Sequence, residues 1–174
     1  MTALTRGVDF VLRLVITSAF AVLVVCVVWQ VFSRYVLESP STVTDEMARF
    51  LFIWVALLGG AYTLGQRRHL AIDLLPVVTT GRARFAVNAG IIGAIALFAG
   101  LIMIYGGLGL VSRTLETGQV SPALRIPMGF IYVAIPFSGF CILYYCLTFL
   151  ADLMRDGRGP NEQLEPPAPG GPLT

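Results

Sequence analysis

The sequence predicts an all-α membrane protein with four transmembrane helices. Three observations support this: apolar residues make up 56% of the 174 residues, charged residues make up only 13%, and the apolar residues gather in four long runs. A typical soluble domain carries about 25% charged residues. This chain therefore lacks the charges needed to cover a water-facing surface, and we expect one four-span membrane domain over residues 1–156.

Four runs are long enough, or nearly so, to cross a bilayer core, which takes about 20 apolar residues of helix. The predicted spans cover about residues 12–34, 45–65, 85–110 and 126–152. The first run continues well past the small residues Ala19 and Ala21, so we interpret it as an uncleaved span and not as a signal peptide. Pro136, near the middle of the fourth run, predicts a kink.

Arginine placement predicts the orientation of the spans. The basic residues number 12, and all of them are arginine. Eight lie in the N-terminus, the loop at 65–84 and the C-terminus, and the other side carries Arg34, Arg49, Arg113 and Arg125. Because positive charge accumulates on cytoplasmic loops, both termini are predicted to be cytoplasmic.

Two segments outside the spans have a distinct character. The inner loop mixes apolar and polar residues over 69–75, which predicts a short interfacial helix. The segment 157–174 is rich in proline and glycine and has little to bury, so we expect a disordered cytoplasmic tail.

Several classes of function are disfavoured. The span centres contain no ionisable residue, although such residues usually mark transport paths. The chain has one histidine, so a haem with two histidine ligands is excluded, and its three cysteines form no C-x-x-C motif. No basic and aromatic cluster indicates nucleic acid binding. We expect no enzyme, metal site or cofactor. The alternatives are a self-sufficient small exporter and, less favoured, a four-span redox protein.

Small residues recur on the third predicted span at helical spacing. Small residues at such spacing let another helix approach closely. That helix belongs either to this chain's own bundle or to a second protein, and the sequence alone leaves both open. The helix-packing candidates are Ala86, Ala89, Gly93, Ala96, Gly100 and Gly107.

The start of the second predicted span combines acidic and basic residues. Asp45 and Glu46 suit a helix N-terminus, where the dipole favours negative charge. Glu46 and Arg49 are three residues apart, so they are expected to meet on one helix face. This pair serves either as a local contact at the membrane boundary or as a polar anchor for a neighbouring subunit.

The motifs resemble the small membrane subunit, DctQ type, of tripartite ATP-independent periplasmic (TRAP) transporters. In that family an acidic pair precedes an Ala-Arg-aromatic run, a glycine-rich turn of helix follows, and a His-apolar-x-Asp segment comes after the span. The resemblance covers about residues 8–155. The motifs follow the family's order, and they lie on four predicted spans with both termini inside. The matching segments are Val31–Leu37, Asp45–Trp54, Leu58–Ala61, His69–Leu75 and Ser121–Met128.

The resemblance implies a non-catalytic subunit in the inner membrane of a bacterium. Such a subunit scaffolds a large membrane subunit, a separate chain, and helps a periplasmic solute-binding protein dock for ion-driven uptake of an organic acid. The long tail after Arg158 departs from the family pattern. The positions expected at the partner interface or the membrane boundary are Glu46, Arg49, Trp54, Gly59, Gly60, His69, Asp73 and Arg125.

Overall fold

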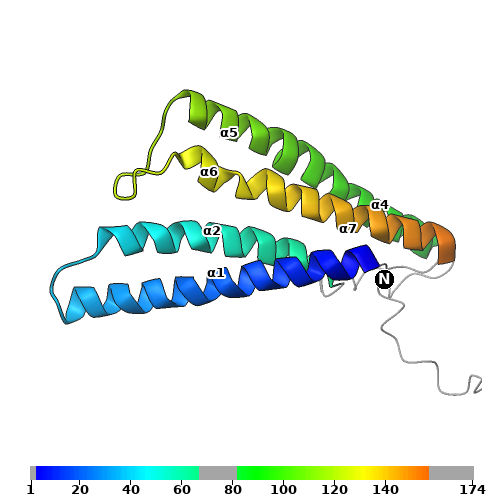
Figure 1. Ribbon diagram of the computed structural model, residues 1–174. Helices are drawn as coiled ribbons and strands as arrows, with labels where there is room; N and C mark the ends of the chain where they lie inside the picture. Colours follow the sequence, from blue (N-terminus) through cyan, green and yellow to red (C-terminus); the bar gives the residue numbers. More distant parts are fainter. Residues whose placement is uncertain (1–2, 67–81, 157–174) are drawn as a thin grey trace, which may run out of the picture.

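The computed structural model describes residues 3–66 and 82–156. The described part of the chain is almost entirely helical (Figure 1). The expected interfacial helix at 69–75 and the expected tail at 157–174 lie outside the described residues. In chain order the helices are α1 (Ala3–Tyr35), α2 (Thr42–Gly65), α4 (Arg82–Phe98), η1 (Ala99–Gly106), α5 (Gly107–Glu116), α6 (Met128–Tyr132) and α7 (Ala134–Asp156).

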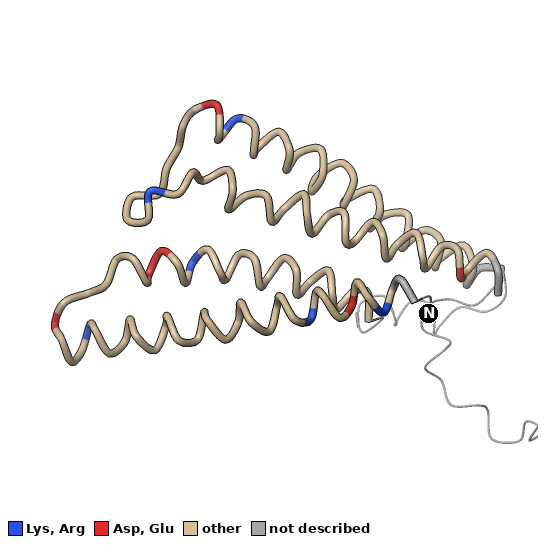
Figure 2. Tube along the Cα trace, viewed as in Figure 1, with Lys and Arg blue, Asp and Glu red and all other residues tan. Residues whose placement is uncertain are grey.

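The predicted fold class is confirmed, because four helical stretches are long and apolar enough to span a membrane. They run over Thr5–Tyr35, Thr42–Gly65, Phe85–Glu116 and Met128–Met154. The third stretch combines α4, η1 and α5 in one continuous helix, of which η1 is π-helical. Among the described residues, Arg, Asp and Glu lie toward the helix ends (Figure 2).

The spans form two antiparallel hairpins (Figure 1). α1 pairs with α2, and the long helix α4–η1–α5 pairs with α6 and α7. Contacts of α2 with α6 and α7 join the hairpins. We call the end where α1 begins and α7 ends the termini end, and the opposite end the distal end. The hairpins converge at the termini end and diverge at the distal end.

The main hydrophobic core lies toward the termini end and draws on all four spans. Leu12 of α1, Leu58 of α2, Ile92 of α4 and Leu153 of α7 are all buried in one cluster with Tyr145. A second, smaller cluster of Leu23, Cys26 and Ala48 joins only α1 to α2. Packing between the hairpins is therefore concentrated at one end of the molecule.

The fourth span is interrupted near Pro136, as expected, but at Val133, between α6 and α7. Pro136 lies in the first turn of α7 and not near the middle of the helix. Proline has no N–H to donate and its ring crowds the preceding turn, which accounts for a break just upstream. The long helix α4–η1–α5 packs closely against α7 at this point, since a Cβ on Gly107 would lie 3.0 Å from the Cδ of Pro136.

Candidate functional site

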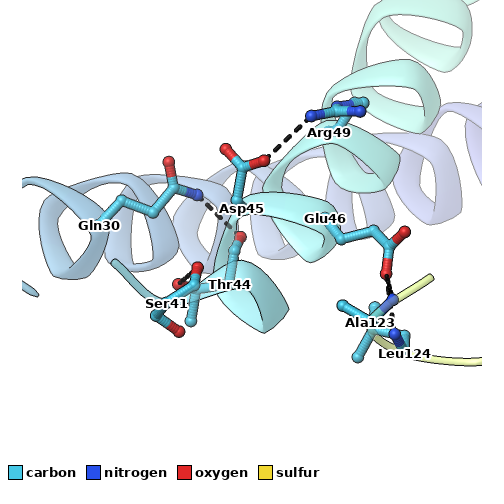
Figure 3. A network of polar contacts seen from close by, with 8 residues as sticks. All are labelled: Gln30, Ser41, Thr44, Asp45, Glu46, Arg49, Ala123 and Leu124. Carbon is cyan, nitrogen blue, oxygen red and sulfur yellow. Dashed lines mark hydrogen bonds and ion pairs between the residues drawn. The ribbon is translucent and has the colours of Figure 1, made fainter. Parts of the chain in front are cut away.

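A group of polar residues gathers at the distal end, where α1 ends and α2 begins (Figure 3). The amide Nε2 of Gln30 donates to the carbonyl of Thr44 at 2.8 Å. The Thr44 hydroxyl donates to the carbonyl of Ser41 at 3.2 Å, and the Ser41 N–H donates to the hydroxyl of Ser33 at 3.3 Å. These bonds hold the turn between α1 and α2. With Asp45, Glu46 and Arg49, these residues form what we call the distal cluster.

Glu46 connects the two hairpins across the distal end. Its Oε2 accepts the backbone N–H groups of Ala123 at 3.0 Å and Leu124 at 2.8 Å (Figure 3). The Glu46 side chain is only 9% exposed. Buried N–H groups need an acceptor, and an ionised carboxylate is among the strongest. One carboxylate on α2 therefore fixes the position of the loop that leads into α6.

The loop at 117–127, held by Glu46, is itself well ordered. Ser121 is fully buried, its N–H donates to the carbonyl of Ile126 at 2.9 Å, and its hydroxyl accepts the N–H of Ile126. Arg125 has a positive φ of 53° and an exposed side chain. Left-handed backbone is uncommon for a residue with a Cβ. The loop thus presents Arg125 at the distal surface on a backbone fixed by Ser121 and Glu46.

The expected pairing of Glu46 with Arg49 is wrong. Arg49 instead pairs with Asp45, with 3.0 Å between Nη2 and Oδ2 (Figure 3). Positions i and i+4 also share a helix face, and the Glu46 carboxylate is already held by the loop. The Arg49 and Asp45 side chains are 68% and 50% exposed, so this pair points away from the core.

The other candidates on α2 differ in their surroundings. Trp54 is half-buried and lies against Phe137 of α7, with 6.5 Å between ring centroids. Gly59 and Gly60 lie on an open face, where an added Cβ would meet nothing within 4 Å. His69 and Asp73 lie outside the described residues. The structure therefore brings Glu46 and Arg125 to the same loop region but leaves the two glycines free on a helix surface.

The small residues of the third span do not share one environment. Gly107 packs against α7, but Gly93 and Gly100 have open space where a side chain would start. Ala86 is exposed, whereas Ala89 and Ala96 are half-buried against the main core. Only part of the predicted stripe therefore contacts α7, and the rest is open.

Sequence reasoning missed a close crossing between α7 and η1. A Cβ on Gly139 would lie 2.8 Å from the Cβ of Met103 and 3.3 Å from the carbonyl of Ala99. Ala99 is fully buried. A glycine in the fourth span was the only signal, and its partner depends on the π-helical stretch, which no periodicity in the sequence indicates.

The termini end holds a second set of polar contacts that sequence reasoning missed. Tyr145 of α7 is almost fully buried, and its hydroxyl donates to the carboxylate of Asp9 on α1. The hydroxyls of Thr5 and Tyr144 are 3.2 Å apart. Asn88 is buried on α4, and its Oδ1 has no hydrogen-bond partner among the described residues. The contacts of Tyr145 with Asp9 and of Tyr144 with Thr5 join α1 to α7, two helices from different hairpins.

Within residues 3–66 and 82–156, the structure has no group of three or more His, Cys, Asp or Glu residues placed to hold a metal ion. The three cysteines are free thiols, buried or half-buried in apolar surroundings. Four apolar spans with charges at their ends define a multi-pass membrane protein whose polar contacts lie at the two ends of a bundle.

Comparison with known proteins identifies the family. Residues 23–156 match the model of the tripartite ATP-independent periplasmic transporters, DctQ component. This match covers well over half of the chain, and the chain belongs to the DctQ family of small TRAP transporter subunits.

Individual relatives agree with this assignment. The chain is 32% identical over 118 residues to the C4-dicarboxylate TRAP transporter small permease protein of Rhodobacter capsulatus, covering 67% of this chain and 51% of that protein. A putative TRAP transporter small permease protein of Haemophilus influenzae is 25% identical over 150 residues, covering 86% of this chain and 91% of the relative. The isethionate TRAP transporter permease protein DctMQ of Oleidesulfovibrio alaskensis is 30% identical, covering 64% of this chain but only 18% of the relative. The chain therefore spans about half of the Rhodobacter relative and a small part of the Oleidesulfovibrio one.

Proposed function

We propose that this chain is a scaffold that binds a large membrane subunit and helps a periplasmic solute-binding protein dock, for ion-gradient-driven uptake of an organic acid. The observation that carries the proposal is the DctQ match over residues 23–156. The absence of ionisable residues at the span centres supports it, because the solute path then belongs to another chain. The protein catalyses no reaction.

The size of one relative supports the proposal of a large partner. The chain covers only 18% of the DctMQ permease protein, so most of that relative lies outside the part that resembles this chain. We propose that a large membrane subunit is the partner of this chain. The printed names of relatives differ in solute, from C4-dicarboxylate to isethionate and ectoine. We propose that selection of the solute rests with the binding protein.

The proposed location is the bacterial inner membrane, with both termini in the cytoplasm. The support for this orientation is the excess of arginine on the side of the termini. The distal end then faces the periplasm, and the proposed contact for the binding protein is Glu116, the last residue of α5, together with Arg125 of the loop that follows. Arg49 lies at the same end and is exposed. At the opposite membrane boundary, His69 and Asp73 remain proposed contacts of the large subunit.

The proposed surface for the large subunit includes the open face of α2. Gly59 and Gly60 have no atom within 4 Å of the place where a side chain would start. Small residues on a membrane helix let a second helix approach closely, which favours van der Waals packing in lipid. Trp54 contributes in a different way, by fixing α2 against α7 through Phe137.

Co-purification tests this proposal. The tagged chain is expressed with its neighbouring reading frames, and we expect it to elute with a much larger membrane subunit. Gly60→Phe should lower the yield of that subunit, whereas Gly90→Phe is the control, because Gly90 also has nothing within 4 Å. If both variants recover the same amount of the large subunit, the α2 face is not part of the interface. Elution of the wild-type chain alone would contradict the scaffold role.

A further inference from the structure

An apolar groove lies between the two hairpins. Its walls come from α1, α2, the loop at 117–127 and α6, and its volume is about 330 Å³. Val15 and Ala19 line it from α1, Trp54 from α2, Leu124 from the loop and Ile131 from α6. The lining side chains are apolar apart from the indole N–H of Trp54, so the groove offers water few hydrogen-bond partners.

The groove is as long as one leaflet is deep. Its lining on α2 runs from Met47, in the second turn of the helix, to Leu58. At 1.5 Å per residue, this stretch is about 16 Å long. A bilayer core is about 30 Å thick. The groove therefore extends from the loop at 117–127 to just past the middle of α2, and its lining on α1, at Val15 and Ala19, lies near the middle of that span.

The groove is small, with a volume of about 330 Å³, and it is open along part of its length. An acyl chain makes no hydrogen bonds, so it suits a lining of apolar side chains. The lining thus favours a lipid chain as the occupant.

A positive charge lies at the mouth of the groove. Leu124 and Ile126 both line it, and the residue between them is Arg125, which is exposed and has no ion pair within the described part of the chain. The nearby carboxylate of Glu46 is already bonded to two N–H groups of the loop. The guanidinium fork of arginine suits bidentate contact with phosphate. Charge and shape are therefore complementary to a phospholipid at this end.

We propose that the groove binds one phospholipid of the distal leaflet, with an acyl chain between α1, α2 and α6 and its phosphate at Arg125. The lipid fills the space where the two hairpins do not pack against each other, and so it completes the distal half of the bundle. The proposal rests on the groove and on the membrane setting, and does not depend on the transport partners.

Native mass spectrometry of the full chain, purified in detergent, tests the proposal. We expect one tightly retained phospholipid on the wild-type protein. Ala19→Phe fills the groove and should reduce the retained fraction several-fold, whereas Ala21→Phe, at an exposed position of the same helix, should not. Equal retention in both variants would overturn the proposal.

Charge variants keep the test informative if Ala19→Phe does not fold. Arg125→Gln should weaken retention about tenfold, the effect of losing a charge-assisted hydrogen bond. Arg34→Gln is the matched control, since Arg34 also lies near the distal end but does not flank the groove. Equal lipid loss in the two variants would show that the phosphate is not held at Arg125.

Tryptophan quenching locates the chain directly. The protein has two tryptophans, and only Trp54 lines the groove, so Trp29→Phe leaves a single reporter. Added phospholipid with brominated acyl chains should quench Trp54 in a saturable way, and the further change Ala19→Phe should abolish the saturable part. If a cysteine placed at position 19 instead cross-links efficiently to a second polypeptide, the groove is a protein interface and the lipid proposal fails.

Discussion

The two ends of this four-helix bundle are held in different ways. At the termini end, buried residues from all four spans form one core, and hydroxyl contacts such as Tyr145 to Asp9 join α1 to α7. At the distal end, the second core joins only α1 and α2, and the Glu46 carboxylate connects α2 to the loop before α6. The two hairpins are therefore held together by a shared core and hydrogen bonds at the termini end, and by the hydrogen bonds of one carboxylate at the distal end.

This difference indicates how the molecule can serve as a subunit. Packing at the termini end fixes the spans relative to one another without a partner, because apolar cores tolerate little rearrangement. The distal end keeps an apolar groove between its helices and an ordered loop above it. We propose that the distal end is where a binding protein and a lipid meet this chain, whereas a large membrane subunit meets the open face of α2.

Replacing Gly65 with a larger residue should lower the stability most, because it disrupts the packing at the termini end. A Cβ there would lie 2.3 Å from Cζ of the Tyr145 ring. Overpacking typically costs about 1–3 kcal/mol, and we expect Gly65→Val to reach at least the upper figure. Thermal unfolding in detergent measures the loss. Gly60→Val is the control, because open space surrounds that position, and equal destabilisation of the two variants would contradict the packed-end description.

Removing the Glu46 carboxylate should have the next largest effect, at the distal end. Glu46→Ala leaves two backbone N–H groups without their acceptor and should cost about 2–3 kcal/mol. Glu46→Gln keeps one acceptor oxygen and should lose about half as much. Hydrogen exchange of the Ala123 and Leu124 amides should accelerate, whereas exchange at the termini end stays unchanged. Unchanged exchange at those two amides would show that the carboxylate does not hold the loop.

Tyr145→Phe should lower stability less, and its effect should fall at the termini end and not at the distal end. The change removes the hydroxyl that donates to Asp9 and should cost about 1 kcal/mol. Exchange should increase in the first turns of α1 and not in the loop at 117–127. Tyr105→Phe is the control, because Tyr105 is 80% exposed. An effect spread evenly over both ends would contradict the division of the bundle.

Asp45→Asn should have the smallest effect. The ion pair of Asp45 with Arg49 is at least half exposed on both sides, and surface pairs at this spacing contribute about 0.3–0.5 kcal/mol. Thermal unfolding should therefore barely change. A loss as large as that of Glu46→Gln would mean that the exposed pair, and not the buried carboxylate, organises the distal cluster.

The number of spans was predictable because hydropathy acts on whole segments. An unbroken apolar run has few alternatives to a membrane helix, whatever its neighbours. The interruption near Pro136 was also predictable, because proline removes one hydrogen bond locally. Its position at Val133 was not, since the close contact with Gly107 of the third span also constrains this region.

The contacts of single side chains were less predictable. Helical spacing pointed Glu46 toward Arg49, but its carboxylate bonds to Ala123 and Leu124, which lie 77 and 78 positions away in the sequence. Nothing in the local pattern indicates which of several acidic residues meets a distant loop. The same holds for Tyr145 and Asp9, 136 positions apart, whose pairing depends on how the hairpins pack.

Reconstituted transport tests the central claim, that this chain assists transport and does not carry the solute itself. Labelled C4-dicarboxylates are supplied to proteoliposomes under an ion gradient. We expect no saturable uptake with this chain alone, and uptake when the proposed large membrane subunit and solute-binding protein are both present. Saturable, gradient-driven uptake by this chain alone would contradict the account.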